Sequence, residues 1–229
     1  MKKIAFSLLF LTSLAFGGDV CTPAPAKEPH LLPCEAPRKL SVRSGIVSCY
    51  DSSLGQSVWA TSEMDPKSSH SFDRDTCDWK IDKNVGSISP AEYANTGYAK
   101  GHLIAFTDAS CASSAADTCV TSNIVPQPGA QNSGVWLRLE KHIRELAAKA
   151  PSKKWLVMAG PRFPETMAWV KPGLAQPNGI WKVLINTTDG TGCGYVGAYL
   201  KPYAVQVVPM ASLGVRGIKD GDPSLCAVK

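Results

Sequence analysis

The sequence lacks most motifs that mark common catalytic sites, and it has little histidine. It contains no P-loop, no glycine-rich dinucleotide turn, no HExxH and no GxSxG. No two cysteines are spaced as CxxC, which argues against a zinc ribbon or a thioredoxin-type redox site. Histidine most often serves as general base near neutral pH. The candidate bases are therefore His30, His70, His102 and His142.

Apolar runs long enough to cross a membrane are missing as well. One shorter apolar stretch covers residues 4–16, follows Lys2 and Lys3, and leads into small residues. A basic start, a short apolar stretch and a small-residue exit are typical of a signal peptide, whereas the alternative is a buried N-terminal helix. We expect residues 1–18 to be cleaved and the protein to be secreted or periplasmic, without a membrane segment.

The composition excludes several protein classes. Charged residues make up 19% and hydrophobic residues 44% of the 229 positions, unlike a disordered chain, a coiled coil or a collagen-like repeat. Loss of residues 1–18 removes two lysines and no acid, so 22 basic and 19 acidic residues leave a net charge of +3. This charge alone does not indicate nucleic-acid binding. We expect a proline-rich arm over residues 19–39 and a single domain over residues 40–229.

Cysteine is plentiful, and all of it follows the expected signal peptide. An even number of cysteines in an exported chain indicates disulfides, some of them tying down the proline-rich arm. Cys111 and Cys119 are the most local candidate pair, because they flank the small-residue segment ASSAADT. The eight cysteines are Cys21, Cys34, Cys49, Cys77, Cys111, Cys119, Cys193 and Cys226.

The hydrophobic pattern predicts an α+β fold with a central, mostly antiparallel sheet. Apolar residues three or four apart predict a helix from Val135 to Ala150, with Ser133 as its N-cap and Pro151 at its end. Alternating or β-branched apolar residues predict the strands. These strands are expected over residues 42–51, 57–64, 155–160, 179–186 and 194–200.

His102 has the most informative surroundings of the four histidines. In the segment YAKGHLIAF, Lys100 supplies a cation and Gly101, which has no side chain, allows close approach. On its own, this pattern is more often structural than catalytic. A second segment, SNIVPQPGAQNSGVWLRLE at residues 122–140, favours the catalytic interpretation of His102. The two segments together match one family in order and spacing.

Together these segments resemble the DNA/RNA non-specific endonuclease family, secreted magnesium nucleases with a ββα-metal core. Family members carry a D-R-G-H segment, followed about thirty residues later by S-N-I-x-P-Q and then by N, W and L-E. The likeness extends over about residues 42–210, because AGPRF and IWKVLI resemble the family's T-G-P and W-K-V strands. The matching positions are Gly101-His102, Ser122–Gln127, Asn132, Trp136 and Leu139-Glu140.

The resemblance implies a role for each matched polar residue. His102 is expected to act as the general base toward water, and a usual pKa of about 6.5 suits that task. Asn132 is the expected direct Mg²⁺ ligand, and such an oxygen site also accepts Mn²⁺. Glu140 is expected to act through metal-bound water. In a regular helix it lies about 12 Å along the axis and roughly 80° around from Asn132. The alternative for Glu140 is a solvated helix face.

Substrate binding is assigned to two cations and an aromatic residue. The resemblance places Arg74 and Lys100 at positions that contact phosphate, and it assigns Trp136 to the substrate-binding wall. The chain departs from the family pattern on both sides of the motif, since Ala99 and Lys100 replace its Asp-Arg pair and Ile104-Ala105 replaces the Ser/Ala-Pro that follows the histidine. Lysine binds phosphate as a point charge, whereas arginine forms two parallel bonds, so this exchange is not neutral.

We therefore expect a Mg²⁺-dependent endonuclease that hydrolyses DNA and RNA without sequence preference. An immunity or inhibitor protein is a further expected partner, since a toxic nuclease often needs one. Two alternatives remain open. The first is a nuclease-like fold that only binds nucleic acid or protein. The second is a phosphodiesterase that acts on small molecules.

Overall fold

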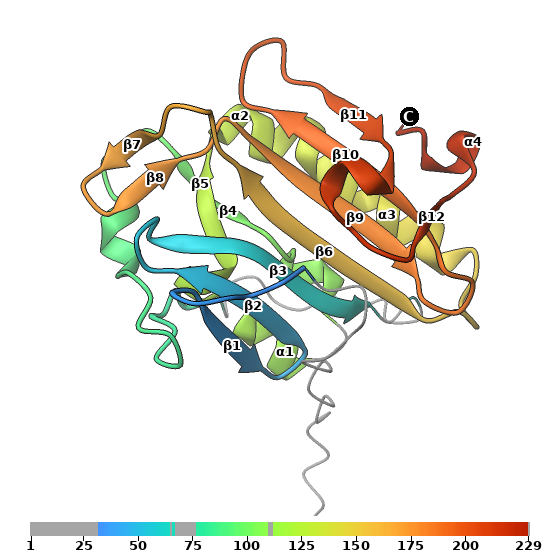
Figure 1. Cartoon of the computed structure of the whole chain (residues 1–229), viewed down its shortest axis with the longest axis horizontal. Coiled ribbons are helices and arrows are strands. Elements are labelled where there is room, and N and C mark those ends of the chain that lie inside the picture. The colour runs from blue at the N-terminus through green and yellow to red at the C-terminus, as the bar shows by residue number, and fades with distance from the viewer. Residues whose placement is uncertain (1–31, 65, 67–76, 110–111, 229) are drawn as a thin grey trace, which may run out of the picture.

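The computed structural model describes residues 32–64, 66, 77–109 and 112–228 and contains one large sheet (Figure 1). The strand order is β1-β2-β3-β6-β9-β10-β11, with β12 beside β10. Every pairing in this sheet is antiparallel except β10–β12, so the predicted α+β fold is confirmed. The strands are β1 (Lys39–Arg43), β2 (Ile46–Asp51), β3 (Gln56–Met64), β6 (Trp155–Arg162), β9 (Gly179–Asn186), β10 (Thr191–Ala198), β11 (Val205–Val208) and β12 (Lys219–Asp220).

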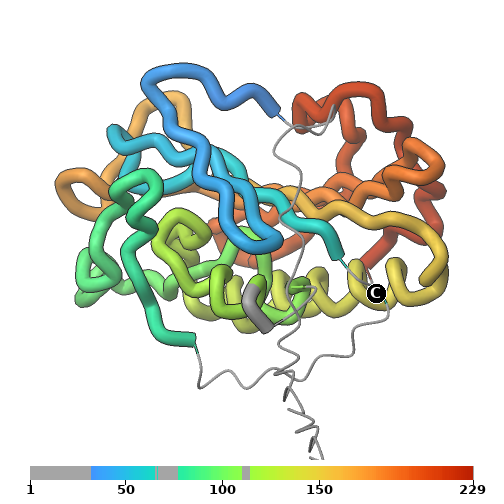
Figure 2. The backbone as a smooth tube through the Cα atoms, turned by 90° about the horizontal axis from the view of Figure 1, so that it is seen from below, coloured from blue at the N-terminus to red at the C-terminus, as the bar shows by residue number. Residues whose placement is uncertain are grey.

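The central strand β9 is buried along its whole length because both faces of the sheet are covered. Ile180 and Leu184 belong to the core on the helix side, while Trp181 and Val183 belong to the core on the other side. Figure 2 shows α3 along one face and residues 32–38 on the opposite one. Side chains alternate along a strand, so Lys182 projects toward the helix.

The main helix differs from the prediction at its start. α2 (Gly129–Gln131), a π-helical turn (Asn132–Trp136) and α3 (Leu137–Ala148) follow one another directly, with a kink at Gly134. The Ser133 hydroxyl donates to the Gly129 carbonyl at 2.9 Å, so Ser133 lies inside the helical segment and its assignment as N-cap is wrong. The predicted end holds, since α3 stops ahead of Pro151.

A two-stranded hairpin precedes this helix and lies beside the large sheet. β4 (Ala99–His102) pairs with β5 (Ile124–Gln127), and the helix begins directly after β5. This strand-strand-helix order is the core that the sequence predicted. The remaining elements are the hairpin β7 (Ala168–Lys171) and β8 (Leu174–Gln176), the helices α1 (Ala112–Asp117) and α4 (Pro223–Cys226), and 3₁₀ turns at Pro90–Tyr93, Phe106–Asp108, Thr121–Asn123 and Met210–Leu213.

Disulfides stabilise the fold, as an oxidising compartment permits. The expected Cys111–Cys119 pair is wrong because Cys119 is bonded to Cys77. Backbone hydrogen bonds explain this pairing: Lys80 N donates to Cys119 O at 3.0 Å, and Thr121 N donates to Lys80 O at 2.9 Å. The three described bonds join Cys34 to Cys49, Cys77 to Cys119 and Cys193 to Cys226.

The expected signal peptide and most of the proline-rich arm lie outside the described residues. The described end of the arm is joined to β2 through Cys34–Cys49. Within the described ranges, no helix combines the length and apolarity needed to cross a membrane.

Candidate active site

A pocket of about 390 Å³ lies between β4 and the main helix. It brings together four residues that the sequence singled out: Lys100 and His102 from β4, Asn132 from the π turn, and Glu140 from α3. The fifth, Arg74, lies outside the described residues. The complete lining is Cys77, Trp79, Lys100, His102, Ala105, Phe106, Asn132, Ser133, Leu137 and Glu140.

Close packing of β4 against β5 holds His102 at the pocket. Gly101 lies opposite Val125, and a Cβ at this glycine would be 2.0 Å from Gln127 Oε1. The predicted close approach at Gly101 is therefore confirmed. Its partner is the Gln127 side chain, which donates to Gln131 on the helix. The glycine thus lets the strand and the start of the helix pack together.

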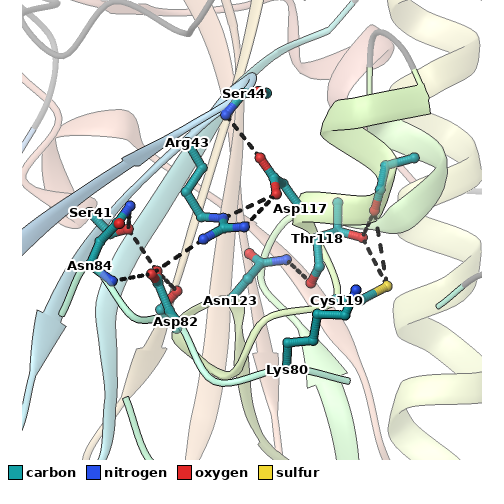
Figure 3. Close-up of polar contacts among 12 residues, drawn as sticks. Ser41, Arg43, Ser44, Lys80, Asp82, Asn84, Asp117, Thr118, Cys119 and Asn123 are labelled. Carbon is teal, nitrogen blue, oxygen red and sulfur yellow. Dashed lines mark hydrogen bonds and ion pairs between the residues drawn. The ribbon is translucent and has the colours of Figure 1, made fainter. Parts of the chain in front are cut away.

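The chain after His102 is fixed by Asn123, a residue of the matched segment Ser122–Gln127 to which the sequence analysis assigned no role. The Asn123 side chain accepts a hydrogen bond from Ile104 N at 3.0 Å and donates to Ile104 O at 2.9 Å. It also donates to Thr118 O at 2.9 Å (Figure 3). One buried amide therefore links the strand that carries His102 to the end of α1.

Trp79 forms an aromatic wall beside His102, and no motif or spacing pointed to this residue. The two ring centroids are 5.0 Å apart, and Lys100 Nζ lies 5.5 Å from a Trp79 ring centroid. A cation over an indole face is attracted by the ring quadrupole. Trp79 thus contacts both the candidate base and the candidate phosphate ligand.

The helix presents two oxygen ligands to the same pocket. The regular-helix geometry assumed for Asn132 and Glu140 is wrong, because a π turn lies between them and Gly134 departs from helical angles (φ −101°, ψ −106°). Both side chains nevertheless line the pocket. An amide oxygen and a carboxylate are hard donors of the kind that Mg²⁺ prefers, so these residues fit a magnesium site.

Glu140 is the centre of a buried charge network, so the alternative of a solvated helix face is wrong. Its Oε1 lies 3.1 Å from Lys182 Nζ, which also lies 3.6 Å from Asp108 Oδ2. Arg144 Nη1 contacts Asp108 Oδ1 at 2.8 Å. Burial raises the pKa of Glu140, and the Lys182 ammonium opposes this rise. Lys182 therefore offsets part of the cost of burying the charged carboxylate and holds it in place.

Trp136 does not line the pocket. Its side chain is fully buried in the core between helix and sheet, with Lys182 Nζ 5.7 Å from its ring. The expectation that Trp136 contacts substrate is therefore wrong. Apolar spacing along the helix places this residue on the same side as Leu139 and Ile143, which explains its burial.

Residues 32–213 match the family model described as DNA/RNA non-specific endonuclease, which is the class that the fold and pocket indicate. The chain belongs to this family, and the resemblance inferred from the motifs is confirmed.

Several relatives support this assignment. Mitochondrial Endonuclease G from Homo sapiens is 31% identical over 168 residues, covering 66% of this chain and 56% of that protein. A nuclease from Serratia marcescens is 28% identical over 120 residues, covering 48% and 45%. The chain spans about half the length of these curated relatives.

A solved structure supports the fold. The crystal structure of an EndoG/EndoGI complex matches with a TM-score of 0.64 and 22% identity, covering 76% of this chain and 81% of that one. At this identity the likeness establishes shared architecture.

Proposed function

We propose that the protein is a Mg²⁺-dependent endonuclease that hydrolyses phosphodiester bonds in DNA and RNA without sequence preference. The observation that carries this proposal is the meeting of His102, Asn132 and Glu140 in one pocket. Their chemistry is complementary, because one imidazole lies on the strand side and two oxygen donors lie on the helix side. Membership in the endonuclease family supports the same reading.

His102 acts as the general base in this proposal. Its imidazole is half-buried at the pocket wall and accepts a proton from the attacking water, a task suited to a group that titrates near neutral pH. Asn132 binds the divalent cation directly, and Glu140 acts through a water. When bound, the cation stabilises negative charge on the scissile phosphate.

Lys100 binds the phosphate backbone, and we assign the same task to Arg74. Contacts to phosphate carry no direct sequence information, which accounts for cleavage without sequence preference. The Trp79 ring restrains the Lys100 side chain near His102. A lysine held in this way replaces part of the orientation that an arginine fork supplies.

The disulfides support a location in an oxidising compartment, and we propose secretion or export to a periplasm after cleavage of residues 1–18. A protein inhibitor is a proposed partner. Its support is the matched structure, which is described as an EndoG/EndoGI complex and as a mechanism of EndoG inhibition.

A cleavage assay tests the proposed function. The chain without residues 1–18, with disulfides intact, is incubated with supercoiled plasmid and with total RNA, in Mg²⁺ or in excess chelator. Both substrates are expected to be degraded only in Mg²⁺. His102→Ala is expected to abolish cleavage with the fold intact, whereas His142→Ala, outside the pocket, is the matched control.

Other outcomes favour the alternatives. Salt-dependent binding without cleavage in Mg²⁺ or Mn²⁺ indicates a nucleic-acid-binding protein. Hydrolysis of a small phosphodiester without cleavage of long duplexes indicates a small-molecule phosphodiesterase.

A further inference from the structure

Three potential zinc ligands meet at one wall of the pocket. The sulfurs of Cys77 and Cys119 and a ring nitrogen of His102 all lie within 4.8 Å of one another. In the oxidised protein the two sulfurs form a disulfide, so they do not serve as thiolate ligands. This group is therefore separate from the oxygen ligands on the helix.

We propose that reduction of Cys77–Cys119 creates a Zn²⁺ site that includes His102 and blocks the nuclease. The inference rests on the proposed function, in which His102 is the general base. A dithiol reductant supplies two electrons and two protons, becomes a disulfide and leaves two cysteine thiols. Zn²⁺ then displaces both thiol protons and binds two thiolates and the imidazole.

The geometry suits a tetrahedral zinc ion. Zn–S bonds of about 2.3 Å and Zn–N bonds of about 2.0–2.1 Å place neighbouring ligand atoms about 3.5–3.8 Å apart. The three ligand atoms lie within 4.8 Å of one another, so small side-chain movements suffice once the S–S bond is broken. Cys77 and His102 line the pocket, which leaves the fourth zinc position to water.

The protein backbone keeps these residues together without the disulfide. Lys80 N donates to Cys119 O, and Thr121 N donates to Lys80 O, which fixes the segment after Cys77 beside the segment after Cys119. The buried Asn123 amide joins the end of α1 to the chain after His102, as Figure 3 shows in part. Reduction is therefore expected to free the sulfurs with little loss of local structure.

Ligand chemistry separates this site from the catalytic one. Thiolates and imidazole favour Zn²⁺, whereas amide and carboxylate oxygens favour Mg²⁺. A zinc-bound imidazole nitrogen no longer accepts a proton from water. The chain is thus expected to be inactive wherever thiols are reduced and zinc is present, and to become active once the disulfide forms.

Cobalt titration tests the site without relying on activity. Co²⁺ is added to the reduced chain, and thiolate-to-cobalt charge-transfer absorption is measured. We expect one strongly absorbing ion per chain, and none in Cys77→Ser/Cys119→Ser. The matched control is Cys193→Ser/Cys226→Ser, which removes another disulfide and is expected to keep the signal. Equal binding by wild type and Cys77→Ser/Cys119→Ser overturns the proposal.

A second variant tests the site in case Cys77→Ser/Cys119→Ser loses the signal only because it misfolds. His102→Ala keeps both cysteines and removes a direct ligand, so it is expected to weaken Co²⁺ binding by more than the roughly 10–100-fold seen when a residue that only supports a ligand is lost. Unchanged affinity in His102→Ala shows that the thiols bind metal without the imidazole, which also overturns the proposal.

An activity comparison separates this proposal from the proposed function. Oxidised and reduced protein are assayed in Mg²⁺ with the same buffered Zn²⁺ concentration. We expect zinc to inhibit only the reduced form. An inactive oxidised enzyme contradicts the proposed function and leaves the cobalt result standing. If the reduced enzyme stays active at saturating zinc, the proposal that zinc bound to His102 blocks the nuclease is wrong.

Discussion

Lys182→Met is the variant that most directly tests how the fold controls the pocket. The lysine is fully buried, and its ammonium lies 3.1 Å from Glu140 and 3.6 Å from Asp108, while Arg144 pairs with the other oxygen of Asp108. Methionine retains similar length without the charge. The variant is expected to leave two carboxylates facing each other across a site from which water is largely excluded.

The structure sets the size of the effect. At the 3.1 Å separation of Lys182 Nζ and Glu140 Oε1, Coulomb attraction amounts to about 5 kcal/mol at an effective dielectric constant of about 20. Desolvation of both groups offsets part of this energy, and breaking a buried pair typically costs about 3–5 kcal/mol of stability. Loss of the ammonium also raises the pKa of Glu140 further, because burial and Asp108 then act unopposed by Lys182.

Two measurements check this reasoning. Urea denaturation gives the loss of stability, and the difference between the pH profiles of plasmid cleavage for Lys182→Met and wild type reports the change in Glu140 ionisation. Activity is expected to fall about 10–100-fold at neutral pH, with the acid limb of the profile moved to higher pH. A structural role alone would lower stability without moving that limb.

A surface ion pair provides the control. Lys153 pairs with Asp189 at 2.8 Å on the surface, so Lys153→Met is expected to cost less than about 1 kcal/mol. Combining Lys182→Met with Glu140→Gln removes both partners, and part of the lost stability is expected to return. If Lys182→Met costs no more than the control and leaves the pH profile unchanged, the charge network does not position Glu140.

Three other variants test separate features by urea denaturation. Gly101→Ala is expected to cost about 1–3 kcal/mol, because its Cβ would lie 2.0 Å from Gln127 Oε1. Cys193→Ser/Cys226→Ser is expected to lose about 2–5 kcal/mol, and an unchanged midpoint would contradict this. Burial raises the pKa of Glu140, so wild type is expected to lose stability relative to Glu140→Gln as pH rises above 4.5, the ordinary value for this carboxyl. A stability difference that stays constant with pH contradicts this.

Strand positions could be predicted because they depend on local pattern. The segment GIWKVLIN coincides with β9, and WLVMAG lies within β6, since a strand covered on both faces needs a nearly continuous apolar run. The start of the helix could not be predicted in this way. Its π turn at Gly134 and the Ser133 hydrogen bond depend on how the segment leaves β5.

The site was only partly predictable for a related reason. Motif spacing predicted that His102, Asn132 and Glu140 meet, because they lie on consecutive parts of one strand-strand-helix unit. His102 is on β4, Asn132 follows β5, and Glu140 is on α3. Lys182 reaches Glu140 from 42 residues away, across a sheet whose order no local pattern fixes. The Cys77–Cys119 bond likewise spans 42 residues, so the nearer pairing with Cys111 was the wrong choice.

The pocket separates two kinds of chemistry on two walls. Lys100, His102 and Trp79 form a wall of nitrogen and aromatic groups, whereas Asn132 and Glu140 supply oxygen from the helix. In the proposed mechanism, a magnesium ion binds at the oxygen wall and the imidazole on the other wall serves as the base. In the proposed switch, reduction of the nearby disulfide adds two thiolates to the wall that carries His102, and a zinc ion bound there occupies the imidazole. The two proposals thus depend on the same division of ligands, and together they predict that reduction in the presence of zinc stops cleavage.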